Sequence, residues 1–293
     1  MSKVSDIVTK KILAELANGT VPWHKPWTTG AMTTGGQCNL ISGKAYQGIN
    51  QILTTISSDY NSPYWLTFKQ AQKLGGSVIK GQESTMVIFY SMFDVTDPAT
   101  ELTRRVPALR YYKVFNTEQC ENISHKRLDA LGDPQAVVKV PTVSESAKAV
   151  NDALVSYFDR SGVTMKAGGN DAFYEPTRDL VQVPVAGAFE SQEAFLHTLA
   201  HEAGHSTGHK SRLKRAGITG ASSDSAKDRY AKEELVAEIC AGMLLASKGC
   251  TPDIKNSASY IEGWLNKLSD DTGMIVSASS QASKATNLIL DNA

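Results

Sequence analysis

The sequence has few cysteines and no long apolar segment. Its four cysteines, Cys38, Cys120, Cys240 and Cys250, form no closely spaced pair, which argues against a cysteine-based zinc finger or redox motif. Few, scattered cysteines are typical of proteins from a reducing compartment. No run of 18 apolar residues is present, and residues 1–11 lack the apolar core of a signal peptide. We therefore predict a cytoplasmic protein that has no membrane partner.

The chain also lacks a net charge. Its 293 residues include 30 basic and 30 acidic side chains, and its content of 41% hydrophobic and 20% charged residues is typical of a globular protein. This length suits two ordinary domains or one large domain. The charge is unevenly spread, because residues 1–141 carry 15 basic and 11 acidic residues whereas residues 142–293 carry 15 and 19. A polyanionic partner is therefore expected to bind the N-terminal part.

The segment His201-Glu202-Ala203-Gly204-His205 carries the strongest chemical signal in the chain. Two histidines four residues apart lie on one face of a helix, where both imidazoles can bind one metal ion. Glu202, next to the first histidine, is placed to act as the general base towards a water molecule. Ser191 is expected to cap this helix. The alternative is a polar helix face on which the histidines only make hydrogen bonds.

An open metal site needs a third protein ligand. His209 is the nearest candidate, but the helix is expected to end before it. Residues 230–238 offer a better one, because Glu234 and Glu238 are four residues apart on one face of a helix that is otherwise rich in apolar residues. Burying two carboxylates there is costly without a cation, so we predict that Glu234 binds the metal and Glu238 orients a ligand histidine. Glu233 is expected to face solvent.

In the N-terminal part, basic and aromatic residues are interleaved within an expected α+β domain. A helix is predicted over 4–17, strands over 64–68 and 109–115, and a hairpin from 78–81 and 85–90. Rings that stack on bases, next to cations that meet phosphates, are typical of single-stranded nucleic-acid binding. The residues of this pattern are Trp23, Lys25, Trp27, Lys44, Tyr46, Trp65, Lys69, Lys80, Arg110 and Tyr112. Either tryptophan of the segment 21–27 is also compatible with a core position.

The C-terminal part is expected to combine helices with a small strand unit. Helices are predicted over 146–160, over 230–245 and over 277–290, and a strand–turn–strand unit over 172–184. In zinc peptidases a strand beside the metal-binding helix often binds an extended peptide. The polar segment 121–141 is predicted to be a linker between domains over residues 1–120 and 142–293. The expected fold class is α+β.

Motifs spread over nearly the whole chain carry a family resemblance. In the N-terminal part they are Pro22-Trp23, Lys25-Pro26-Trp27, Asn39, Gly43-Lys44, residues 46–50, residues 65–70 and Lys80-Gly81, and in the C-terminal part they are His201-Glu202, His205, residues 207–209 and residues 230–238. Together they resemble the ArdC family of plasmid antirestriction proteins. The N-terminal part is similar to the single-stranded-DNA-binding region that this family shares with the TraC primases of conjugative plasmids.

The resemblance implies a single-stranded-DNA-binding domain followed by a zincin-like metallopeptidase domain of the gluzincin type. It adds Asn39, Asn50 and Gln70 to the DNA-binding residues. It also implies a divalent metal in the second domain, either Zn²⁺ or Mn²⁺ or another ion, with Glu234 as third ligand and Glu238 in a supporting position. His209 and Tyr230 are expected near the ligands, and together with Arg212 they are candidates for stabilising an oxyanion.

The predicted function is that of an antirestriction protein that binds single-stranded DNA and protects incoming DNA from host restriction. Its metal-dependent peptidase-like site uses His201, His205 and Glu234 as ligands and Glu202 as base. The sequence does not identify its protein substrate, and a host restriction enzyme is one candidate. The alternatives are a non-catalytic protein that occludes DNA and holds a structural metal, and a regulatory metalloprotease that does not bind DNA.

Overall fold

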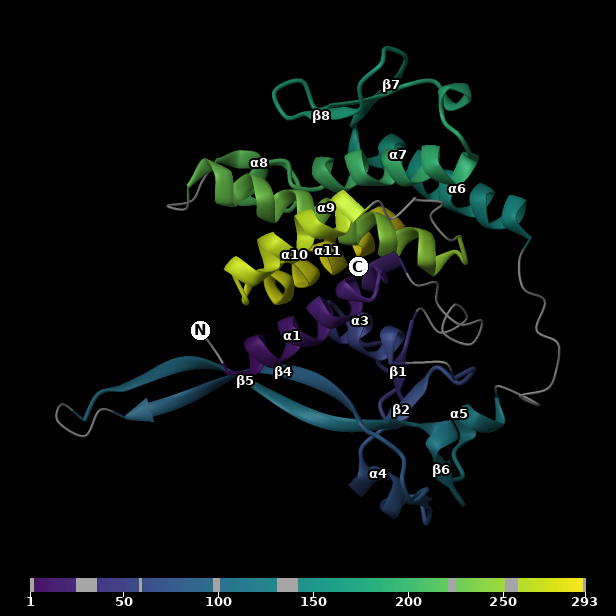
Figure 1. The fold of residues 1–293 in the computed structure, drawn as a ribbon, viewed down its shortest axis with the longest axis vertical. Coiled ribbons are helices and arrows are strands. Elements are labelled where there is room, and N and C mark those ends of the chain that lie inside the picture. Colours follow the sequence, from purple (N-terminus) through teal and green to yellow (C-terminus); the bar gives the residue numbers. More distant parts are fainter. Residues whose placement is uncertain are drawn as a thin grey trace.

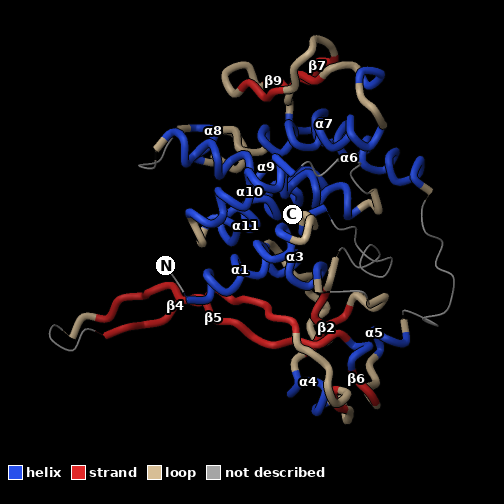
Figure 2. Tube along the Cα trace, viewed as in Figure 1, coloured by secondary structure: helices blue, strands red, loops and turns tan. Residues whose placement is uncertain are grey.

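A computed structural model describes residues 3–24, 36–57, 60–96, 101–130, 142–220, 225–250 and 258–291. In Figure 1 the long strands of the N-terminal part lie at one end of the molecule and a small C-terminal sheet lies at the other. Helices from both parts fill the space between them (Figure 2). The predicted α+β class is confirmed.

The N-terminal part is built on a four-stranded sheet in the order β1-β2-β5-β4. Its helices are α1 (Lys3–Ala17), η1 (Pro22–His24), α3 (Ile49–Ile56), α4 (Phe68–Lys73), η2 (Thr117–Gln119) and α5 (Lys126–Asp129), and its strands are β1 (Cys38–Asn39), β2 (Tyr64–Leu66), β3 (Ser77–Val78), β4 (Thr85–Thr96), β5 (Thr103–Asn116) and β6 (Cys120–Glu121). β1 runs parallel to β2, and the other pairs in this sheet are antiparallel. The predicted helix over 4–17 is confirmed as α1.

The predicted hairpin partner of residues 85–90 is wrong. β4 pairs with β5 over its whole length, from Thr85 opposite Val114 to Thr96 opposite Thr103. Val78 instead pairs with Cys120 in a separate two-stranded sheet. An alternating pattern predicts a strand but not its partner, and the longer β5 offers β4 many more ladder hydrogen bonds than residues 78–81 do.

The C-terminal part packs α7 against a three-stranded sheet in the order β7-β9-β8. Its helices are α6 (Val143–Ser161), η3 (Ala186–Ala188), α7 (Gln192–Ser206), α8 (Ala216–Thr219), α9 (Ala226–Ser247), α10 (Ala258–Asp270) and α11 (Met274–Leu290), and its strands are β7 (Thr164–Ala167), β8 (Phe173–Glu175) and β9 (Leu180–Val183). The strand–turn–strand unit predicted over 172–184 is therefore confirmed as β8 and β9. None of the helices in the described ranges combines the length and apolar character that crossing a bilayer requires.

Helices α7 and α9 pack closely enough to bring their polar side chains together. α7 begins at the predicted cap, because the Ser191 hydroxyl accepts a hydrogen bond from the backbone N–H of Ala194. Gly204 lies at the contact, where a Cβ atom would be only 3.2 Å from Cα of Ala237. The absence of a side chain at Gly204 thus allows the two backbones to approach.

One buried apolar cluster takes residues from both predicted domains. Ile12 and Leu16 of α1 and Trp23 of η1 belong to it together with Leu199 of α7 and Leu244 of α9. The Trp23 ring makes an edge contact with Trp264 of α10, with ring centroids 6.1 Å apart. α1 and η1 therefore share a core with the C-terminal helices, and the division into two domains stays a prediction.

Part of the predicted linker is packed against the N-terminal sheet. Residues 121–130 include α5, whose Arg127 guanidinium donates to the carbonyls of Leu40 and Ile41 at 2.9 Å each. These contacts tie α5 to the end of β1, and the linker over residues 121–141 stays a prediction. Residues 131–141 lie outside the described ranges.

Gly242→Ala is expected to destabilise the fold through the contact between η1 and α9. A Cβ atom at Gly242 would lie 2.2 Å from the carbonyl oxygen of Trp23, which is backbone and cannot rotate away. We expect a loss of about 1–3 kcal/mol in the free energy of unfolding, as for other overpacked cores. Urea titration followed by circular dichroism measures it.

Gly263→Ala is the matched control, because Gly263 is an exposed glycine of α10 with open space around it. An alanine there stabilises the helix by about 0.5–1 kcal/mol. If the free energy of unfolding changed by the same amount and in the same direction in both variants, the contact between Trp23 and Gly242 would be contradicted.

Candidate functional site

The predicted metal ligands meet between α7 and α9. The Nε2 atoms of His201 and His205 are 3.1 Å apart. The Glu234 carboxylate lies 3.4 Å from Nε2 of His205 and 3.7 Å from Nε2 of His201. Ligand atoms around a tetrahedral zinc ion are separated by roughly 3.3 Å, given metal–ligand distances of about 2.0–2.1 Å. The three side chains therefore fit one divalent cation, and their role as ligands stays a prediction.

The Nδ1 atoms of His201 and His205 face away from the candidate ligand cluster, and each one contacts a different glutamate carboxylate. Nδ1 of His201 lies 3.2 Å from Oε2 of Glu238, and Nδ1 of His205 lies 3.3 Å from Oε1 of Glu233. Such contacts orient an imidazole and hold its Nε2 towards a metal. Burial opposes protonation of His201, but its contacts with Glu234 and Glu238 raise its pKa to about 10. A cation that binds here therefore displaces a proton.

Glu233 does not face solvent, so that expectation is wrong. Its side chain is buried and paired with Arg215, whose Nε and Nη2 donate to the Glu233 carboxylate at 3.0 and 2.6 Å. Burial alone would raise the pKa of Glu233, but the hydrogen bonds from His205 and Arg215 outweigh it and lower the pKa. Spacing along α9 could not reveal this contact, because Arg215 lies just before α8, and only the packing of α8 on α9 brings it to Glu233.

Glu202 is buried at the side of the cluster that faces β8. Burial raises the pKa of Glu202, whereas His201 and His205 oppose that shift. The backbone of Tyr174 in β8 also lowers the pKa of Glu202, as the smallest of the causes. A raised pKa brings a carboxylate closer to the range in which it accepts and releases a proton efficiently.

Tyr230 and His209 differ in their relation to the ligands. Tyr230 is exposed on α9, one turn before Glu234, whose charge and hydrogen bond raise the pKa of the tyrosine. It therefore stays protonated and can donate a hydrogen bond near the cluster. His209 contacts Ser211 at 2.8 Å and Asp179 at 3.8 Å. The structure places it in the group around Asp179, and its supporting role stays a prediction.

Arg212 also belongs to the Asp179 group. Its guanidinium donates to the Asp179 carboxylate, with one distance of 3.0 Å, and its Nε donates to the carbonyl of Ser206 at 2.8 Å. Tyr174 donates its hydroxyl to the same carboxylate at 2.7 Å. Arg212 thus ties the end of α7 to the turn between β8 and β9. Because these partners occupy its N–H donors, it is a poor candidate for stabilising an oxyanion.

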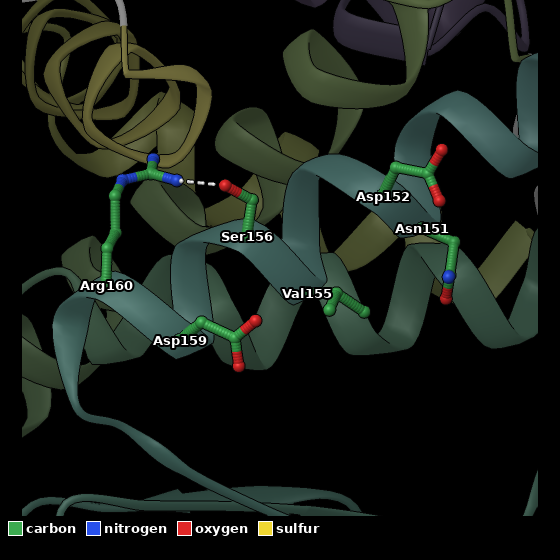
Figure 3. Close-up of a pocket in the computed structure, with 6 residues that line it drawn as sticks. All are labelled: Asn151, Asp152, Val155, Ser156, Asp159 and Arg160. Atoms are coloured by element: carbon green, nitrogen blue, oxygen red, sulfur yellow. Dashed lines mark hydrogen bonds between the residues drawn. The ribbon is translucent and has the colours of Figure 1, made fainter.

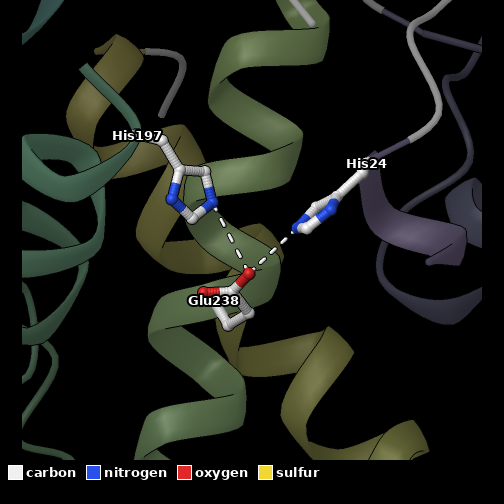
Figure 4. Close-up of side chains that lie close together, drawn as sticks. All are labelled: His24, His197 and Glu238. Carbon is white, nitrogen blue, oxygen red and sulfur yellow. Dashed lines mark hydrogen bonds and ion pairs between the residues drawn. The ribbon is translucent and has the colours of Figure 1, made fainter. Parts of the chain in front are cut away.

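Two buried histidines near this cluster were missed by the sequence analysis. His197 lies one turn before His201 on α7, and His24 lies in η1; both face Glu238 (Figure 4). The signal for His197 was its spacing of four residues from His201. His24 has no comparable signal, because η1 and α9 are more than 200 residues apart in the sequence.

A cavity of about 650 Å³ in the N-terminal part collects several predicted DNA-binding residues. Asn39, Lys44, Tyr46, Asn50 and Gln70 line it together with Gln47, Phe89, Tyr90 and Tyr112. Phe89 and Tyr112 are about half exposed, at 50% and 47%, and their rings meet edge to face with centroids 5.1 Å apart. The cavity therefore presents aromatic rings and a lysine in one place.

The amides of this group form the wall of the cavity. The Asn50 side chain donates to the carbonyl and accepts from the N–H of Ile88, both at 2.7 Å. Asn39 donates to Gln70, which in turn caps α4 at Thr67. Because their polar atoms are engaged within the protein, these residues shape the cavity. Lys44, Phe89, Tyr90 and Tyr112 offer exposed side chains to a ligand there.

The remaining predicted DNA-binding residues fall into three groups. Trp23 and Trp65 are 3% and 0% exposed, so the prediction that they stack on bases is wrong and the core alternative holds. The Trp65 ring donates to the Gln37 side chain at 2.7 Å. Lys69, Lys80 and Arg110 are exposed but do not line the cavity. Lys25 and Trp27 lie outside the described residues.

A second hollow of about 610 Å³ runs along the outer face of α6 (Figure 3). Figure 3 shows Arg160 donating to Ser156, a 3.0 Å bond within the helix. Arg160 also donates to the carbonyl of Leu288 at the end of α11. None of the predicted site residues lines this hollow, and its charged residues are accounted for by helix surface contacts.

Comparison with known proteins places this geometry in a family. Residues 152–281 match the family model of a zincin-like metallopeptidase, and residues 2–115 match that of the N-terminal domain of anti-restriction factor ArdC. The metal-free crystal structure of antirestriction protein ArdC from plasmid R388 is 33% identical, with a TM-score of 0.74 over 99% of this chain and 97% of that chain. The chain belongs to the ArdC antirestriction family.

Other members extend this result. The Mn(II)-bound structure of ArdC from plasmid R388 matches with a TM-score of 0.73 at 33% identity, over 99% of this chain and 98% of that chain. The DNA primase TraC of Escherichia coli is 30% identical over 302 residues, which cover 97% of this chain. The chain spans about a fifth of that primase, since the match covers 20% of its length. The predicted ArdC resemblance and the zincin-like assignment of the C-terminal part are confirmed.

Proposed function

We propose that this ArdC-family chain is an antirestriction protein with two activities. Its N-terminal part binds single-stranded DNA, and its C-terminal part is a metal-dependent peptidase. The peptidase proposal rests on one observation. The ligand atoms of His201, His205 and Glu234 lie close enough together to bind one metal ion, and Glu202 follows His201 on the same helix. The cytoplasmic location predicted from the sequence and the protein substrate stay predictions.

The surroundings of the metal cluster support peptide hydrolysis. A divalent metal held there supplies Lewis acidity that polarises a peptide carbonyl. Glu202 accepts the proton of the attacking water at its carboxylate, and Tyr230 is placed to donate a hydrogen bond to the developing oxyanion. β8 is an edge strand whose Tyr174 backbone is close enough to Glu202 to influence the pKa of that carboxyl, so an extended peptide that adds to this edge lies near the base.

Glu234→Ala tests whether this cluster binds the metal. Structural zinc sites with four ligands bind with about 10–16 kcal/mol, so removing one ligand is expected to weaken binding by roughly 10²–10³-fold. Isothermal titration of the metal-free chain with Zn²⁺ and, separately, with Mn²⁺ measures this and ranks the two ions. Glu262→Ala removes an exposed carboxylate of α10 and serves as the control. Unchanged affinity in Glu234→Ala would remove this residue from the ligand set.

Tyr112→Ala tests the proposed nucleic-acid site. Stacking on one aromatic ring contributes about 1–3 kcal/mol per base, so the affinity for a single-stranded oligonucleotide should fall about 5- to 150-fold. Fluorescence anisotropy at several salt concentrations measures it, because phosphate contacts weaken binding as salt rises.

Tyr111→Ala is the matched control. Tyr111 and Tyr112 are neighbours on β5 and are 49% and 47% exposed, but successive side chains of a strand point to opposite faces and only Tyr112 lines the cavity. We expect less than a twofold change for Tyr111→Ala. Equal losses in the two variants, or an affinity that does not depend on salt, would overturn the assignment of this cavity.

A further inference from the structure

His24, His197 and Glu238 form a second cluster of potential ligand atoms next to the first. His24 comes from η1, His197 from α7 and Glu238 from α9, and all three side chains are buried. Their ligand atoms lie within 4.8 Å of one another. Figure 4 shows both imidazoles pointing at the same carboxylate.

The register of α7 against α9 explains why two clusters occur side by side. His197, His201 and His205 follow one another at intervals of four and share one face of α7, and Glu234 and Glu238 do the same on α9. His205 meets Glu234 and His197 meets Glu238, so the two helices run in opposite directions. The second cluster therefore repeats the first about one helical turn, roughly 5.4 Å, further along.

The distances in the second cluster suit shared ligation better than hydrogen bonding alone. Nε2 of His24 lies 2.9 Å from Oε1 of Glu238, which a hydrogen bond accounts for. Nε2 of His197 lies 3.5 Å from the same oxygen, and among the described residues it has no hydrogen-bond partner although it is buried. Leaving a buried polar atom unpaired costs about 1–3 kcal/mol. A spacing of 3.5 Å is ordinary for two atoms bound to one cation, as the first cluster with 3.1–3.7 Å illustrates.

We propose that His24, His197 and Glu238 bind a second divalent cation. Two imidazoles and one carboxylate favour Zn²⁺ or a similar transition-metal ion over Ca²⁺ or Mg²⁺, which prefer oxygen ligands. Glu238 then links the two sites, because its Oε1 faces His24 and His197 while its Oε2 contacts Nδ1 of His201. The second ion anchors η1 to α9 and fixes the carboxylate that orients a ligand of the first site.

This arrangement gives the N-terminal part a direct connection to the metal centre. His24 immediately precedes residues 25–35 in the chain, and it reaches Glu238 across 214 positions of sequence. Trp23, its neighbour, packs against Gly242 one turn beyond Glu238 on α9. The second cation therefore adds to an apolar contact that already holds η1 on α9.

The number of bound ions tests the proposal on the full-length chain. The metal-free protein is loaded with Zn²⁺ and desalted, and zinc per chain is measured by inductively coupled plasma mass spectrometry. We expect two ions in the wild type, one in Glu234→Ala, and one in each of His24→Ala and His197→Ala. His125→Ala removes a histidine outside both clusters and should retain two.

Crystals of the loaded wild type provide a test that needs no variant. Anomalous diffraction at the zinc edge should show two peaks separated by about one helical turn, one between His201 and His205 and one between His24 and His197. A single ion that is lost in Glu234→Ala and retained in His197→Ala would overturn the proposal, because the second cluster would then be a hydrogen-bonded network only. No bound zinc at all would overturn both sites.

Discussion

Glu202→Gln is expected to abolish peptide hydrolysis while the metal stays bound. Glutamine has the size of glutamate and keeps a side-chain oxygen that accepts hydrogen bonds, but it cannot take a proton from water. General bases contribute about 10²–10⁴-fold to the rate of the reactions they catalyse. The rate of cleavage of a fluorogenic peptide library by the metal-loaded chain should fall by that factor. The pKa of Glu202, which burial raises, makes this residue suited to the role.

Two further measurements make this variant decisive. Zinc content and affinity for single-stranded DNA should be unchanged in Glu202→Gln, because Glu202 belongs neither to the metal-ligand cluster nor to the N-terminal cavity. Glu193→Gln, which changes a carboxylate near the start of the same helix, should cleave at the wild-type rate. If the wild type cleaves no faster than a chelator-treated sample, the peptidase proposal is wrong.

The same variant separates antirestriction by hydrolysis from antirestriction by occlusion. Protection of an incoming plasmid can be measured as its survival in a restricting host that expresses the variant. If cleavage falls and protection is lost, hydrolysis is needed. If protection survives, the non-catalytic alternative accounts for antirestriction.

Arg215→Ala is expected to destabilise the fold by about 3–5 kcal/mol, because it leaves the Glu233 carboxylate buried without a cation. The guanidinium and the carboxylate are both about 5% exposed. Besides Glu233, Arg215 donates to the Thr207 hydroxyl at 2.6 Å and to the Gly204 carbonyl at 2.7 Å. It therefore joins the end of α7 to the start of α9. Urea titration in the presence of chelator measures the loss without a contribution from bound metal.

An exposed ion pair provides the comparison for Arg215. Arg178 is 69% exposed and lies 3.4 Å from Glu175, so Arg178→Ala should cost about 0–1 kcal/mol. Combining Arg215→Met with Glu233→Gln removes both buried charges and should recover part of the stability. A loss for Arg215→Ala no larger than that for Arg178→Ala would contradict the burial of this pair.

Local sequence patterns correctly placed the elements that carry the candidate metal site. Ser191 caps α7, and the interval of four residues puts His201 and His205 on one face, because both depend only on the geometry of a single helix. The same argument predicted that Glu234 and Glu238 share a face of α9. The cost of burying their carboxylates predicted that this face meets the histidines, which the structure also shows.

The tryptophans illustrate what a local pattern cannot decide. An aromatic residue beside a lysine has the same signature whether its ring faces bases or the core, and Trp23 and Trp65 turned out to be core residues. The exposed rings that line the N-terminal cavity, Phe89, Tyr90 and Tyr112, come from β4 and β5. Their pairing depends on a strand register that an alternating pattern does not specify.

The sequence by itself thus determined which face α7 and α9 each present with their candidate ligands, since periodicity is a property of one segment. Only the tertiary structure decided which distant groups complete the site. Arg215 reaches Glu233 through the packing of α8, and His24 reaches Glu238 through the packing of η1 on α9. The contact between His24 and Glu238 joins residues 214 positions apart, and it forms because burying the apolar faces of α1, η1 and α9 together holds those segments in contact.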